Sequence, residues 1–234
     1  MPSVIGTPSS QYQASSASST FSHTVPATGA RRALRVFVAA FNGGGGSITG
    51  VTYAAQAMTK VGATYGTIST EGIVEQYILV NPATGANDVV ISASGSLSEI
   101  LGVASGWENV NQSTPTSDSD GGTGSGATPS ITLTVTGSDV GVAGVEFFSA
   151  NADDPTQSDT LLAEIAATAS TTGCSDQYGD GSLSWTINGG SAYAFCGMTI
   201  VHDAGGGGGS PALDDSGSFP GFEAQSNPLV ISVW

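Results

Sequence analysis

Few side chains in this sequence have the types and spacing that catalysis needs. The only histidines are His23 and His202, and no serine lies in a Gly-x-Ser-x-Gly motif. A serine–histidine–carboxylate triad needs a histidine between nucleophile and acid, so two isolated histidines offer few ways to form one. The carboxylate pairs Asp153–Asp154 and Asp214–Asp215 lie among Gly, Pro and Ser residues, which is typical of solvated turns rather than of glycosidase sites. The sequence therefore predicts no catalytic residue, and we expect that the chain is not an enzyme.

Metal ligands are also weakly indicated. Residues 118–121 (DSDG) and 176–181 (DQYGDG) place carboxylates beside glycines as calcium loops do, but neither segment has the closing glutamate of the full loop. Cys174 and Cys196 lack the CxxC and HxxxH spacing of a zinc site. Cys196 lies in an apolar run and is predicted to be buried, with a disulfide between neighbouring strands as the alternative. We expect no metal and no cofactor, with a structural or incidental calcium ion as the alternative.

The charges are divided along the chain. All four basic residues lie within the first 60 positions and all 19 carboxylates follow residue 70, which gives a net charge of −15. A surface this acidic repels phosphate groups, so we do not expect nucleic-acid binding. Arg31, Arg32 and Arg35 hold three of the four positive charges beside a polar N-terminal segment. We therefore predict that they face a partner, with the alternative that they only cover the edge of a sandwich.

The composition indicates a surface built from hydroxyls and amides. Charged residues make up 10% of the chain, well below the usual share, whereas glycine accounts for 34 residues. The 234 residues, 39% of them apolar, suffice for one β-sandwich or two small domains. No apolar run reaches the length of about 18 residues that a membrane span needs, and the N-terminal segment lacks the regions of a secretion signal. We expect an extracellular or virion protein that does not contact a membrane and that leaves the cell by a route other than secretion, such as lysis.

The apolar residues follow the period of β-strands. In residues 131–136 and 183–188 they alternate with Thr, Ser or Asn, which is typical of half-buried antiparallel strands. The segment 159–170 fits a helix or a strand, and the strand is slightly favoured. Gly189–Gly190 predicts a hairpin between the strands on either side. Other runs are apolar on both faces and predict strands that are covered on both sides, namely residues 33–41, 72–80, 88–93, 99–105 and 140–148.

These patterns predict an all-β protein, with an antiparallel, jelly-roll-like β-sandwich over residues 19–204. Residues 1–18 are polar and low in complexity, so we predict a flexible N-terminal arm that orders on a partner. Residues 114–130 are predicted to form a long exposed loop or a linker. In the third region, residues 205–234, a glycine run is predicted to tether a C-terminal strand. That strand would be anchored in its own sheet, which we favour, or in a partner, by Leu229, Ile231 and Val233.

Several of these segments together resemble a known domain. They are RRALRVFVAAF (31–41), SITGVTYAAQAMTKVG (47–62), VEQYILVNPATGANDVVISAS (74–94), ASGWENVNQSTP (104–115) and GSLSWTINGGSAYAFCGMTIV (181–201). The pattern is similar to a β-sandwich domain that recurs in phage virion and tail-associated proteins and in some bacterial surface proteins. The likeness covers about residues 19–202, and the acidic extension beyond Asp203 departs from it. The resemblance implies a virion structural protein that is made in the host cytoplasm and released by lysis, and it carries no catalytic residue.

The expected function is therefore that of a capsid decoration (cement) protein on the virion surface. Its partner would be the major capsid protein or another virion protein, and we expect a homo-oligomer such as a trimer. The alternative is a carbohydrate-binding tail or fibre module for host attachment, because exposed aromatic rings can stack on sugars. Trp185 alternates with Leu183 and Ile187 and is predicted to lie in the core, whereas the sequence does not decide whether Trp107 and Trp234 are buried or exposed.

Overall fold

The computed structural model describes residues 1–41, 46–67, 72–148, 155–165, 172–187 and 191–204. Within these ranges the chain contains strands and no helix, so no described helix could cross a membrane. All strand pairs in them are antiparallel, which confirms the predicted all-β antiparallel sandwich. The strands are β1 (Ser3–Val25), β2 (Ala33–Phe41), β3 (Ile48–Tyr53), β4 (Gln56–Ala57), β5 (Thr59–Thr67), β6 (Gly72–Val80), β7 (Gly85–Glu108), β8 (Thr116–Gly126), β9 (Ser130–Thr132), β10 (Val140–Phe148), β11 (Thr156–Gln157), β12 (Thr160–Ile165), β13 (Thr172–Gly179), β14 (Ser182–Thr186) and β15 (Ser191–Ile200).

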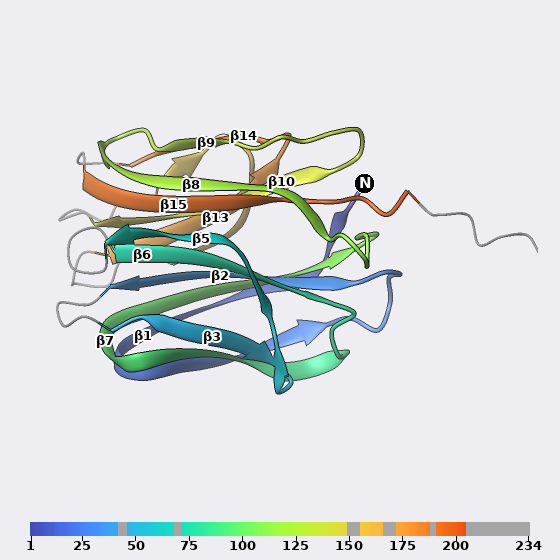
Figure 1. Cartoon of the computed structure of the whole chain (residues 1–234), viewed down its shortest axis with the longest axis horizontal. Helices are drawn as coiled ribbons and strands as arrows, with labels where there is room; N and C mark the ends of the chain where they lie inside the picture. The colour runs from blue at the N-terminus through green and yellow to red at the C-terminus, as the bar shows by residue number, and fades with distance from the viewer. Residues whose placement is uncertain (42–45, 68–71, 149–154, 166–171, 188–190, 205–234) are drawn as a thin grey trace, which may run out of the picture. The chain divides into compact units, whose positions relative to one another are not determined.

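The strands form three sheets. A seven-stranded sheet has the order β4-β3-β7-β2-β6-β5, with β1 paired to β7 outside this path. A five-stranded sheet has the order β12-β13-β10-β15-β8, and a three-stranded sheet has the order β11-β14-β9. Figure 1 shows the five-stranded sheet between the other two, so the described residues are arranged in stacked layers.

The seven-stranded sheet folds over on itself, because its two longest strands bend. The first part of β7 pairs with β3 and the second part pairs with β2, while β1 follows β7 along both parts. Side chains from the two halves therefore pack together in one core, in which Val51 and Val89 belong to one half and Val36 and Ile100 to the other. This core lies within a single curved sheet and not between two sheets.

Two further interfaces hold the layers together. Phe37 and Leu101 of the seven-stranded sheet share a core with Cys174 and Cys196 of the five-stranded sheet. The opposite face of the five-stranded sheet packs against β9 and β14, with Trp185 buried between them as predicted. The strands β2 and β10 therefore have neighbours on both faces, which explains why their sequences are apolar without alternation.

The layers approach each other closely at Gly144 in β10. A Cβ atom added there would lie 2.6 Å from the ring of Phe37 in β2, so no side chain fits between the two sheets at this point. Glycine within a strand often marks such a close approach. The residue thus fixes the spacing at which Phe37 and its neighbours pack.

The structure differs from the sequence prediction in the N-terminal segment. Residues 3–18 are not a free arm but the first part of β1, which pairs with residues 92–108 of β7 with register shifts between Ile5 and Ser9 and between Ser16 and Ser18. This part of the strand is rich in Ser, Gln and Ala and has no alternating apolar pattern. Its side chains are partly or fully exposed, and the pairing is made by backbone groups. Polar composition predicted an arm, but backbone hydrogen bonds to a central strand do not depend on apolar side chains.

Two other segments also depart from prediction. Residues 116–126, expected in a loop or linker, form β8 and pair with β15 at the edge of the five-stranded sheet. The strands on either side of Gly189–Gly190 do not form a hairpin, since β14 pairs with β9 and β11 whereas β15 pairs with β10 and β8. Residues 160–165 form β12, which confirms the favoured strand for that part, and residues 166–170 lie outside the described residues.

His23 is buried in the second part of β1, with 1% of its surface exposed. Its Nδ1 lies 3.1 Å from Ser9 Oγ, and its ring is edge-on to Tyr53 at 6.4 Å. Burial lowers the pKa of His23 from 6.5 to about 4. Between these two values the unfolded chain binds a proton that the folded chain does not. The stability contributed by neutral His23 is therefore complete above pH 6.5 and is lost as the pH falls toward 4.

We expect the replacement His23→Gln to remove this part of the pH dependence. As the pH falls from 7.5 to 4, the free energy of unfolding of wild type should decrease by about 3 kcal/mol more than that of the variant. Urea unfolding of both proteins at several pH values measures it, and subtraction removes the groups that the two proteins share. A difference that stays constant with pH would show that His23 is not buried in its neutral form.

Candidate functional site

The residues predicted to face a partner are brought together only in part. Arg35 is fully buried in β2, which contradicts its prediction as a surface residue. Side chains alternate between the two faces of β2. Those of Leu34 and Val36 point into the core of the curved sheet, and that of Arg35 therefore points the other way, between the two larger sheets. Leu229, Ile231 and Val233 lie outside the described residues, and their anchoring role stays a prediction.

Arg35 is the centre of a polar network that joins the two larger sheets. Its Nη1 forms an ion pair with Asp176 of β13, and both side chains are fully buried. Its Nε donates a hydrogen bond of 2.8 Å to Gln76 Oε1 of β6, and Gln76 Nε2 donates one of 2.6 Å to the carbonyl of Cys196 in β15. The guanidinium also lies 5.7 Å from the centre of the Phe37 ring. Four strands from two sheets are thus linked by one side chain and its partners.

The electrostatics of this network are those of a buried ion pair. Burial raises the pKa of Asp176 to about 6, although the neighbouring Arg35 opposes the increase. The Asp176 carboxylate, which the sequence offers as part of a calcium loop at 176–181, is therefore paired with an arginine inside the protein. Among the described residues no three His, Cys, Asp or Glu side chains gather as a metal site would require.

Arg31 and Arg32 lie at the surface, between β1 and β2. Arg31 forms an ion pair with Asp203, and 38% of its side chain is exposed. Arg32 donates hydrogen bonds of 3.1 Å and 2.8 Å to the carbonyls of Ala27 and Gly29. The fourth basic residue, Lys60, contacts Glu75 at 2.7 Å. Every basic side chain of the protein therefore has an intramolecular partner, and the unbalanced charge at the surface is negative.

The two cysteines are not placed for a disulfide. Cys174 lies in β13 and Cys196 in β15, and β10 pairs with both strands from its position between them. Strands two places apart in a sheet are about 10 Å from each other, whereas a disulfide joins Cα atoms about 4.4–6.8 Å apart. Both thiols are free and buried, as predicted for Cys196, and the disulfide alternative is wrong. Burial raises the pKa of both thiols, which makes them poor nucleophiles.

A surface groove of about 690 Å³ lies where the seven-stranded and five-stranded sheets present neighbouring edges. It is lined by residues 59–62 of β5, 78–80 of β6, residues 112, 113 and 115, and residues 116–119 of β8. We call it the edge groove. Its volume is in the range of ordinary ligand sites, which measure about 300–1,000 Å³. No sequence pattern pointed to it, because its walls come from segments that are far apart in the chain.

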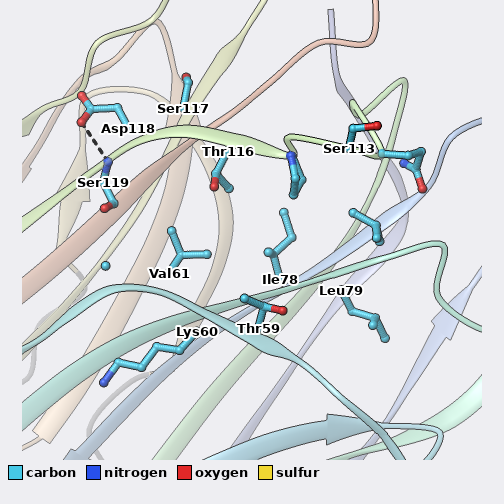
Figure 2. A pocket seen from close by; sticks show the side chains of 14 residues that line it. Thr59, Lys60, Val61, Ile78, Leu79, Ser113, Thr116, Ser117, Asp118 and Ser119 are labelled. Atoms are coloured by element: carbon cyan, nitrogen blue, oxygen red, sulfur yellow. Dashed lines mark hydrogen bonds between the residues drawn. The ribbon is translucent and has the colours of Figure 1, made fainter.

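The edge groove has an apolar floor and a hydroxyl wall. Figure 2 shows Val61 and Ile78 turned toward the space between the strands, opposite Thr116 of β8. Lys60 points away toward Glu75, and Asp118 also points away, where it accepts a hydrogen bond of 2.7 Å from the backbone N–H of Thr134. The groove itself therefore presents aliphatic, hydroxyl, amide and backbone groups, while the charged ends of Lys60 and Asp118 point away from it.

One end of the groove is closed by a close approach between its walls. A Cβ atom added at Gly62 would lie 3.0 Å from Ser119 Oγ, and Gly62 has a positive φ of 73° that other residues rarely adopt. The turn of β5 at Gly62 thus brings this strand against β8. Beyond this point the two strands separate, and the groove lies between them.

No aromatic side chain lines the edge groove. Trp107 and Trp185 are both buried, so neither ring can stack on a sugar at the surface, and Trp234 lies outside the described residues. The edge groove therefore lacks the stacking platform that a carbohydrate-binding module needs, and the half-buried tyrosines Tyr12 and Tyr193 lie outside its lining.

The fold and groove together define an all-β sandwich protein with an open cleft between two sheet edges. Comparison with known proteins finds no matching family model, no matching curated protein and no matching solved structure. The function is therefore argued from the geometry of this chain.

Proposed function

We propose that this chain is a virion structural protein, most concretely a capsid decoration protein that sits on the particle surface as a homo-oligomer such as a trimer. The observation that carries the proposal is how the side chains capable of chemistry are used. Arg35 and Asp176 join two sheets in the interior, and the cysteines are buried with raised pKa values. These groups stabilise a layered body instead of acting on a substrate.

The surface also supports attachment to another protein. All four basic side chains have intramolecular partners, while carboxylates such as Asp88, Asp120 and Asp180 are exposed. Such a surface favours a basic or polar protein partner and disfavours nucleic acid. The segments between residues 31 and 201 that resemble virion β-sandwich domains overlap strands β2 to β7, β14 and β15. The major capsid protein, or another virion protein, is the partner that this proposal names.

The alternative of a carbohydrate-binding tail or fibre module is less well supported. The hydroxyl groups of the edge groove suit hydrogen bonding to sugars, but the groove has no aromatic residue on which a sugar ring could stack. Binding of the full-length protein to an array of bacterial surface glycans tests this alternative directly.

Electron microscopy of particles from a lysed culture that produces this chain tests the proposed function. Gold-labelled antibodies against the chain should bind over the capsid shell of the purified particles. Light scattering of the purified protein should give a mass of three times the 23.1 kDa chain if the trimer forms in solution. Labelling confined to the tail would favour the attachment module, and a chain that stays in the soluble fraction without labelling particles would overturn the proposal.

A further inference from the structure

We propose that the edge groove binds an extended segment of the partner protein, which adds as a strand to β5 at residues 59–61 and carries Lys or Arg on its flanks. This inference rests on the proposed function and assigns the docking site for it. The occupant is a polypeptide in β conformation, because the groove runs along the exposed edge of a sheet. Such an edge offers unpaired backbone N–H and C=O groups to another chain.

The edge of β5 is open where the groove lies. Its pairing with β6 is regular over residues 59–61, and the register then shifts between Val61 and Tyr65. Irregular pairing and edge lysines normally protect a sheet edge from other strands. Here the irregular pairing begins at Gly62, the closed end of the groove, and the ammonium group of Lys60 is held by Glu75 and Thr64. Residues 59–61 therefore lack both forms of protection.

The shape and polarity of the groove suit a strand with alternating side chains. One face of an added strand would cover the half-buried Val61, which packs on the core that contains Ile78, and the opposite wall would offer the hydroxyls of Thr116 and Ser119. Alternate residues of the segment are therefore expected to be aliphatic and small polar. An apolar floor beside hydrogen-bonding groups provides both burial and direction for such a chain.

The charge proposed for the flanks follows from the net charge of the protein, −15. The protein carries 19 carboxylates against four basic residues, and each of these four has an intramolecular partner. A segment with Lys or Arg beside its central residues would gain from this field, and one with Glu would be repelled. The preference should weaken at high salt, because exposed charges are screened.

Synthetic peptides with the full-length protein test the proposal. The probe is a fluorescein-labelled peptide of alternating Val and Thr with Lys at both ends, and the controls carry Glu at the ends or Pro in the centre. We expect the Lys peptide to bind at least about tenfold more tightly than either control, which corresponds to about 1.4 kcal/mol. Hydrogen exchange should slow at residues 59–61 on binding. Equal binding of all three peptides, no binding of the Lys peptide, or protection elsewhere would overturn the proposal.

The variant Thr116→Trp fills the groove and should weaken binding of the Lys peptide at least about tenfold. Thr160→Trp is the matched control, because Thr160 lies on β12 at the other edge of the same five-stranded sheet and is exposed. Both variants should melt within a few degrees of wild type. If Thr116→Trp folds and binds the peptide as wild type does, the groove is not the site. A glycan that binds wild type and is lost with Thr116→Trp would assign the groove to a sugar and overturn the peptide proposal.

Particle attachment separates this inference from the proposed function. If wild type binds the capsid and Thr116→Trp does not, both the decoration role and the groove as docking site are supported. If the two proteins bind the capsid equally, the groove is not the docking site, and the decoration role is unaffected. If neither protein attaches to particles, the decoration role fails, and the peptide measurements alone decide whether the groove binds an extended chain.

Discussion

Replacing Arg35 with Met lowers the free energy of unfolding by about 3–5 kcal/mol, the usual result of removing one partner of a buried ion pair. Asp176 would keep its buried position without the guanidinium, and Gln76 would lose the donor at its Oε1. Because the network joins both larger sheets, the loss should be felt in the cooperative unfolding of the whole described body. Urea unfolding followed by tryptophan fluorescence measures it, since Trp107 and Trp185 are buried.

Two further variants make this result specific. In the double variant Arg35→Met/Asp176→Leu no charge of the pair remains buried, so its stability should return to within about 1–2 kcal/mol of wild type. Arg31→Met is the matched control, because Arg31 also pairs with an aspartate but is 38% exposed, and its replacement should cost at most about 1 kcal/mol. The account of the buried network fails if Arg35→Met costs no more than Arg31→Met. It also fails if the double variant is less stable than the single one.

Deleting residues 2–18 leaves no soluble, folded protein. These residues form the first part of β1, and their loss would strip one edge from residues 92–108 of β7, the strand to which β2 is also paired. A long apolar strand with unpaired backbone groups is prone to pair with other chains and aggregate. Expression followed by size-exclusion chromatography measures the effect, with the wild-type chain processed in parallel.

The deletion also decides between the two accounts of this segment. A free arm could be removed with no change in the melting temperature, and a deleted protein that stays monomeric and melts as wild type would therefore restore the predicted arm. The control is Ala17→Lys in the full-length chain, since Ala17 is exposed and lies at the register shift of β1. We expect this variant to fold normally, which would show that the segment tolerates surface change but not removal.

The sequence alone predicted the elements that have a strong apolar pattern. The runs at 33–41, 72–80 and 140–148 are strands with both faces largely buried. A short run that is apolar at successive positions predicts this, because both faces of the strand must then avoid water. The burial of Trp185 and Cys196 followed from the same signal. An arginine within the apolar run at 33–41 also carried information, since a charge in a covered strand requires a buried partner. That requirement could have identified Arg35 as interior, although the sequence could not name Asp176 as its partner.

The tertiary structure decided which strands pair and what lies at their edges. Residues 3–18 and 116–126 have too few apolar residues to be recognised as strands, yet each pairs with a strand far away in the chain. Sheet pairing uses backbone groups that all residues share, so a polar segment joins a sheet when its neighbour offers an edge. The edge groove arises in the same way, because residues 59–61 and 116–119 become neighbours only after two sheets have stacked. The local pattern of side chains determined the strands, and long-range contacts between them determined the network around Arg35 and the groove.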